Sequence, residues 1–68
     1  MNKFPERLKL LRKEMGLTQT ELAEKLGLKQ ATVAKWEKGE RTPYIDYFIE
    51  LAKFFNCTID FLVGLVDF

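Results

Sequence analysis

Residues 17–39 read LTQTELAEKLGLKQATVAKWEKG, and this stretch decides the fold. Thr18 and Glu21 have the spacing of a capping box, in which each side chain accepts a hydrogen bond from the other residue's backbone N–H at the start of a helix. Gly27 stands where that helix has to end, because glycine readily adopts the left-handed backbone of a helix C-terminus. The stretch therefore predicts two short helices joined by a tight turn, over about residues 18–38.

Apolar residues at helical spacing give both segments an inner face. Leu22, Ala23 and Leu26 share one side of the first segment, and Val33 and Trp36 lie three apart in the second. Ala23 is small, as required where two helices cross closely. We expect helix-turn-helix geometry, in which the second helix protrudes and fits the major groove of DNA. A generic helical hairpin has the same periodicity, so the pattern alone leaves both interpretations open.

The segments on either side of the hairpin are also periodic. Apolar residues recur at helical steps before it, in Phe4, Leu8, Leu11 and Met15, and after it, in Ile45, Phe48, Leu51, Ala52 and Phe55. Thr58 is placed to cap a short last helix, with Leu62 and Val63 on its inner side. No segment alternates polar and apolar residues, which argues against strands. We predict an all-α fold, a compact five-helix domain spanning residues 1–68.

Composition excludes several classes of protein. The chain has 68 residues, 47% of them hydrophobic, with no histidine and one cysteine. No His/Cys zinc site and no histidine-containing triad can be assembled, so we expect no metal, no cofactor and no enzymatic activity. No apolar run approaches the roughly 20 residues that span a bilayer. We expect a cytoplasmic, nucleoid-associated protein without membrane contact, and no feature indicates a small-molecule effector.

Positive charge is concentrated before residue 42. Residues 1–41 contain ten Lys/Arg and six Asp/Glu, a balance of +4, whereas residues 42–68 contain one Lys and four Asp/Glu, a balance of −3. A basic half favours a polyanionic partner. Two ordinary solvated faces would give the same split, so charge alone does not choose between these interpretations.

The segments LTQTELAEKLG (17–27) and AKWEKG (34–39) together resemble the XRE family, the Cro and lambda-repressor-like helix-turn-helix regulators. Residues 51–52 and 58–64 also match the family's last two helices, so the resemblance covers about residues 4–65. It implies a lambda-repressor-like fold and sequence-specific binding of double-stranded DNA. A transcriptional repressor of bacterial or phage type is the leading expectation.

The resemblance also implies roles for individual residues. The recognition helix is expected over about residues 30–38. Its first residues, Gln30, Ala31 and Thr32, and Lys35 one turn further along, are expected to contact base edges. Phosphates are expected to be contacted by Gln19, Lys29, Lys38 and Arg41. The amide of a glutamine can bond adenine, and a lysine can donate to guanine. For each single lysine, a solvated surface charge is an equally good interpretation.

The resemblance also concerns an ion pair between two helices and the residues that precede two helix starts. The family pairs the positions of Arg12 and Glu37, which implies an ion pair between the first helix and the recognition helix. Lys29 stands where the family often has serine or threonine, and a lysine cannot cap a helix start. Tyr44 likewise replaces a common small capping residue before the fourth helix.

The acidic part of the chain has more apolar residues than its own core needs. A two-fold dimer through residues 44–66 would bury them, and the candidates for its interface are Tyr47, Phe54, Phe61, Leu65 and Phe68. Such a homodimer would bind a pseudo-palindromic operator. A folded-back tail covering the patch is the other interpretation. The alternative function is an antitoxin-like or adaptor module that binds a protein through this aromatic face.

Overall fold

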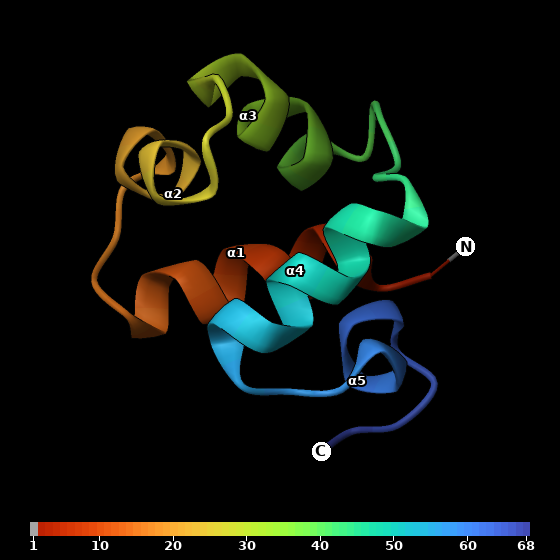
Figure 1. Cartoon of the computed structure of the whole chain (residues 1–68). Helices are drawn as coiled ribbons and strands as arrows, with labels where there is room; N and C mark the ends of the chain where they lie inside the picture. The colour runs from red at the N-terminus through yellow and green to blue at the C-terminus, as the bar shows by residue number, and fades with distance from the viewer. Residues whose placement is uncertain (1) are drawn as a thin grey trace.

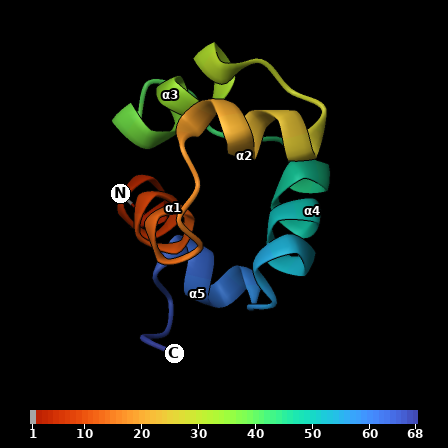
Figure 2. The same ribbon diagram turned by 90° about the vertical axis from the view of Figure 1, so that its left-hand side faces the viewer.

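The structure is a computed structural model that describes residues 2–68. These residues form five helices, α1 (Phe4–Glu14), α2 (Gln19–Leu26), α3 (Gln30–Lys38), α4 (Ile45–Phe55) and α5 (Ile59–Val63), and contain no strand. The predicted all-α, five-helix architecture is confirmed. Figures 1 and 2 show α2 and α3 at one end of the molecule, α5 at the other, and α1 between them.

Side-chain caps fix where α2 begins. The Thr18 hydroxyl accepts from the Glu21 backbone N–H at 3.1 Å, and the Glu21 carboxylate accepts from the Thr18 N–H at 2.8 Å. The bond from the Thr18 backbone is the main reason that the pKa of Glu21 lies below its ordinary value. By contrast, Lys29 and Tyr44 precede α3 and α4 without any side-chain cap. The starts of these two helices therefore depend on tertiary packing.

Two of the glycines with positive φ, Gly27 and Gly64, end helices at positions where other residues would be strained. Gly27 ends α2 with φ +71°, which turns the chain directly into α3. Gly64 ends α5 with φ +87°, and a Cβ atom at that position would lie 2.8 Å from the side chain of Lys3. Both positions need glycine, the first for its backbone conformation and the second also for lack of space.

One core joins all five helices. The ring of Phe4 in α1 lies edge-on to Trp36 in α3 and to Phe48 in α4, with centroids 6.2 and 4.9 Å apart. Trp36 is 1% exposed, so it is a packing residue and does not stack on bases. Within residues 2–68 the buried core cluster consists of Phe4, Leu8, Leu22, Ala23, Val33, Trp36, Phe48, Leu51 and Leu62.

Two of the expected inner positions are wrong. Met15 is 49% exposed, because α1 ends at Glu14 and Met15 lies beyond the last helical turn. Ile45 is 62% exposed. It precedes the buried Leu51 by six residues, which at 3.6 residues per turn places it about 120° around α4 from Leu51. A separate result is that no helix in residues 2–68 has the length and apolarity needed to cross a membrane.

Candidate nucleic-acid interface

The turn between α2 and α3 holds α3 at the surface. The Leu28 N–H donates to the Ala23 carbonyl at 2.8 Å, which closes the turn around Gly27. Ala23 and Val33 are 1% and 0% exposed where the two helices meet. This packing uses only the inner face of α3, and Figure 1 shows the helix at the upper edge of the molecule. Its outer face is free to contact a partner.

The outer face of α3 is basic. Ala31, Lys35 and Lys38 follow one another at steps of four and three residues, and all three are exposed. Lys29, just before the helix, and Arg41, just after it, are exposed too. Within the described residues, none of these four cationic side chains belongs to an ion pair. Their charge is therefore available to an anionic partner.

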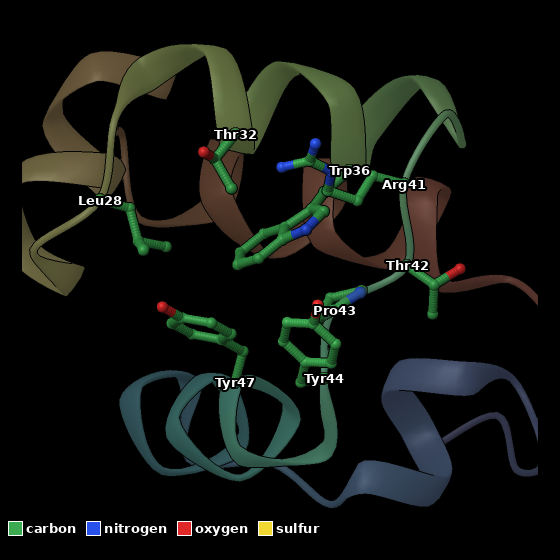
Figure 3. A pocket seen from close by; sticks show the side chains of 8 residues that line it. All are labelled: Leu28, Thr32, Trp36, Arg41, Thr42, Pro43, Tyr44 and Tyr47. Atoms are coloured by element: carbon green, nitrogen blue, oxygen red, sulfur yellow. The ribbon is translucent and has the colours of Figure 1, made fainter.

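Gln30 and Thr32 occupy the flanks of this face. Gln30 is the exposed first residue of α3, and its Nε2 donates to Oε1 of Gln19, the first residue of α2, at 2.7 Å. Both glutamines are predicted site residues, but their contact is not evident from the sequence; the only signal for it is that they begin two consecutive helices. Thr32 is half-buried, and Figure 3 shows it at the edge of a pocket between α3 and α4.

A chain of hydrogen bonds continues from Gln19 to α1. The Gln19 Nε2 donates to Glu37 Oε1 at 3.1 Å. Arg12 donates to the same carboxylate from Nε at 2.6 Å and from Nη2 at 3.0 Å, so the two side chains form the ion pair that the resemblance implied. The Arg12 Nη1 also donates to the Leu17 carbonyl at 2.8 Å.

This ion pair is almost completely buried. The side chains of Arg12 and Glu37 are 10% and 4% exposed. The hydrogen bonds to Glu37 raise the pKa of Arg12 above its ordinary value, against the opposing effect of burial. The chain of bonds therefore links α1, the end of α3, the start of α2 and the start of α3 around one fixed charge pair.

The pocket shown in Figure 3 lies between α3 and the segment that leads into α4. Its volume is about 400 Å³, and its lining includes Trp36, Arg41 and Tyr47. The Tyr47 ring packs on Trp36 with centroids 5.6 Å apart. Tyr47 is therefore half-buried and packs beside α3.

The other candidate interface residues lie nearer the end of the chain and differ in exposure. Leu65 and Phe68 are 76% and 91% exposed, whereas Phe54 and Phe61 are half-buried. The guanidinium carbon of Arg7 lies 4.2 Å from the centroid of the Phe61 ring and covers that face. Leu65 and Phe68 are thus the two members of the predicted set that solvent reaches most freely.

Arg7, which no sequence motif indicates, holds the segment after α5. Its Nη1 donates to the carbonyls of Phe61 and Val66 at 2.8 and 3.0 Å, and its Nη2 pairs with Asp67 at 3.1 Å. Part of the acidic segment therefore folds back on α1, but it leaves Leu65 and Phe68 exposed. These partners are 54 to 60 residues away in sequence, so no local sequence pattern predicts the contacts.

Comparisons with known proteins agree with this arrangement. A helix-turn-helix family model, HTH_3, matches residues 8–62. A solved transcriptional regulator from Listeria innocua is 42% identical, with a TM-score of 0.89 over 97% of this chain and 62% of that one. The transcriptional activator BcrR of Enterococcus faecalis is 39% identical over 90% of this chain and 30% of its own length. The cryptic phage CTXphi transcriptional repressor RstR of Vibrio cholerae is 32% identical over 91% of this chain and 55% of its own length.

The matches identify a family, but they cover only part of the length of each relative. The chain spans between 30 and 57% of the length of three curated relatives that it matches. These relatives are transcriptional regulators and not enzymes, which confirms the expectation that the chain is not an enzyme. With the family model covering residues 8–62 and the five helices arranged as in a solved regulator, the chain belongs to the XRE-type helix-turn-helix family of transcriptional regulators.

Proposed function

We propose that this domain binds a specific double-stranded DNA sequence through α3 in the major groove and represses transcription from the bound site. The observation that carries the proposal is the anchored amide of Gln30 beside a row of exposed, unpaired cations on one protruding helix. Family membership supports DNA binding as the general activity.

The hydrogen bond to Gln19 determines what Gln30 can offer to a base. One Nε2 hydrogen is used on Gln19, which leaves the second hydrogen and Oε1 of Gln30 free. Adenine presents the complementary pair in the major groove, an N6 donor beside the N7 acceptor. Gln30 is therefore the adenine reader in this proposal. Lys35 donates to guanine, Ala31 meets a thymine methyl group, and Thr32 contacts DNA only at the edge of the face.

The remaining cations hold the phosphate backbone. Lys29, Lys38 and Arg41 flank α3, so they reach the backbone on either side of the groove while the helix lies in it. Gln19 adds the start of α2, where free backbone N–H groups and the helix dipole attract a phosphate. Such contacts set affinity and orientation, and they make binding depend strongly on salt.

Replacing two lysines separates base reading from phosphate contact. A preferred site is first selected from a random duplex library, and affinities for it and its single-base variants are then measured by fluorescence anisotropy. Lys35→Ala should cost about 1–3 kcal/mol and relax preference at one base position. Lys38→Ala should weaken all sequences evenly and lower the salt slope by about one unit.

The control for this experiment is Lys53→Ala, which removes the exposed lysine of α4, far along the chain from the hairpin. It should leave affinity and sequence preference unchanged. If Lys35→Ala weakens every sequence equally, Lys35 does not read a base. If the wild-type domain shows no salt-dependent affinity for any duplex, the DNA-binding proposal fails.

Repression is the finer part of the proposal. One relative is named as a repressor and another as an activator, so the family leaves the direction open. A protein bound over a promoter blocks polymerase by occupying its site, and this needs no further contact with the transcription machinery. A reporter whose promoter overlaps the selected site should lose expression when the domain is supplied, and a gain in expression would reverse this part.

We also propose that the domain acts as a homodimer. The segment after α5 lies at the end opposite α2 and α3 (Figure 1) and carries the exposed Leu65 and Phe68, so a partner bound there leaves both recognition helices free. Two such helices would have to lie about 34 Å apart, one turn of DNA, to bind successive half-sites. Joining two domains that each bind DNA weakly raises the overall affinity for DNA without any new contact.

Sedimentation equilibrium tests the dimer. The wild type should associate reversibly at micromolar concentrations. Leu65→Asp should be monomeric with unchanged helicity, because Leu65 is 76% exposed and outside the core, and it should bind the full operator much more weakly. Phe61→Asp is the less clean variant, since Phe61 also packs under Arg7. A wild-type monomer at every concentration, with full affinity for one half-site, would overturn the dimer.

The exposed Leu65 and Phe68 also favour one second candidate, an adaptor or antitoxin-like module that binds another protein. In that case the apolar end, and not α3, would carry the activity. Absence of duplex binding at moderate salt, together with a monomeric wild type, would favour this candidate over the first.

A further inference from the structure

The pocket beside α3 has the dimensions of a small-molecule site. Its volume of about 400 Å³ falls within the roughly 300–1,000 Å³ of known ligand pockets. Thr32 and Trp36 of α3 form one wall, and Tyr44 and Tyr47 at the start of α4 form the other, with Pro43 beside Tyr44 (Figure 3). One wall belongs to α3 and the other to the start of α4, so the pocket is a gap between two elements through which a ligand can enter.

Trp36 contributes a buried hydrogen-bond donor without a partner. The residue is 1% exposed, and its indole Nε1 finds no acceptor within residues 2–68. Buried N–H groups in folded proteins almost always have a partner, so each exception needs an explanation. Figure 3 shows the nitrogen turned towards Pro43 and Tyr44 in the pocket lining. Tyr44 is 80% exposed, so little packing holds its side chain in one place on this side of the pocket.

Arg41 and the two tyrosines define the chemistry that complements this donor. Arg41 lines the pocket, is exposed, and forms no ion pair among the described residues. A guanidinium prefers a carboxylate, which it can bind through two parallel hydrogen bonds. The rings of Tyr44 and Tyr47 offer flat apolar surfaces to a planar ligand. We infer that the pocket binds a small aromatic carboxylate, with its ring against the tyrosines and its oxygens shared by Arg41 and the Trp36 N–H.

Occupancy of this pocket would act on α3 directly. A bound carboxylate neutralises Arg41 and holds its side chain towards the pocket, and the ligand lies against Thr32. If Arg41 contacts a phosphate, the ligand and DNA compete for the same cation, so each weakens binding of the other. This coupling rests on the proposed function, whereas the binding site itself does not.

Intrinsic fluorescence provides a direct test, because Trp36 is the only tryptophan in the chain. The protein is titrated at constant ionic strength with benzoate, with benzamide as a neutral ring of similar size, and with inorganic phosphate as an anion without a ring. Benzoate should change the emission saturably with a Kd of about 1 mM, the range expected for so small a ligand. Benzamide and phosphate should each bind at least about tenfold more weakly.

Two matched substitutions assign the effect to the pocket. Arg41→Gln should weaken benzoate binding about tenfold, while Lys38→Gln, which removes the same charge outside the lining, should leave it unchanged. A purely linear response to benzoate, or equal affinity in the two variants, would overturn the site. Phosphate binding as strong as benzoate binding would show a general anion site and overturn the aromatic class.

A second measurement isolates the coupling. Saturating benzoate should lower the affinity of the wild type for its selected duplex and should have little effect on Arg41→Gln. If benzoate binds but duplex affinity is unchanged, the coupling is wrong and the site stands. If no duplex binds under any condition, the proposed function fails, and the fluorescence result still decides the site.

Discussion

Removing one side of the buried Arg12–Glu37 pair should destabilise the domain far more than removing one side of an exposed ion pair. Arg12→Ala strands a carboxylate whose side chain is 4% exposed, leaving only the Gln19 amide to bond it. Breaking a buried ion pair in this way costs about 3–5 kcal/mol. A domain of 68 residues is stable by only about 3–10 kcal/mol. The single substitution should therefore consume much of the free energy of unfolding.

The pair is best measured by a double-mutant cycle. Glu37→Ala leaves Arg12 with its bond to the Leu17 carbonyl, and the double variant leaves no unpaired charge. The double variant should thus lose less than the sum of the two single losses, with a coupling energy of at least about 0.5 kcal/mol. Urea unfolding followed by Trp36 fluorescence gives each value. If Arg12→Ala is unfolded in water, Arg12→Lys can replace it, since lysine keeps the positive charge but cannot form the bidentate contact with the Glu37 carboxylate.

Lys13→Ala is the matched control, because Lys13 lies beside Arg12 in the last turn of α1 but is exposed. It should change the free energy of unfolding by no more than about 0.5 kcal/mol. Strictly additive single effects at Arg12 and Glu37 would refute the reasoning, because two groups in direct contact would then contribute independently.

Three other outcomes follow from local features. Thr18→Ala should lower the unfolding free energy by about 1 kcal/mol near neutral pH. Because the pKa of Glu21 is lowered in the folded state, its share of the capping box is lost as the pH falls through that lowered value, so the destabilisation caused by Glu21→Gln should shrink in acid unfolding curves, whereas that of Thr18→Ala should persist. Burial raises the pKa of the Cys57 thiol, so a chromogenic disulfide reagent should react more slowly with the folded chain than with the chain in urea, and equal rates would contradict this. Gly64→Ala should be more destabilising than Gly27→Ala in thermal melts: both incur a left-handed backbone penalty of about 1–2 kcal/mol, but only at Gly64 does the new Cβ meet a side chain, at 2.8 Å.

The α2–α3 hairpin was predictable because its determinants are local. Thr18 and Glu21 stand three residues apart, and both bonds of their capping box are present. Gly27 is left-handed where the turn requires it. Val33 and Trp36 are buried at the expected spacing. Each of these features is decided within one or two helical turns, so the sequence contains the whole reason for it.

Features set by distant packing were not predictable in this way. Met15 continues the apolar stripe of α1, yet the helix stops one residue earlier. Tyr47 appears surplus in the acidic half, and only the approach of α4 to Trp36 shows what it packs against. The Arg7 contacts and the pocket at α3 both require knowledge of which elements become neighbours in space. Periodicity identifies the inner side of a helix but not what will face it.

The hydrogen bonds from Arg7 to Phe61, Val66 and Asp67, together called the Arg7 clamp, also affect how the domain folds while it is made on the ribosome. Arg7 reaches Asp67 across 60 residues, and the Lys3 N–H donates to the Val63 carbonyl at 3.0 Å. At about 5–20 residues per second, a ribosome needs about 3–12 s to synthesise the chain between the two ends of the clamp. During that interval the first turn of α1 exists without the carbonyls that will satisfy its arginine. Among these five helices α1 is therefore synthesised first and completed among the last, because the partners of its first turn are made at the end of the domain.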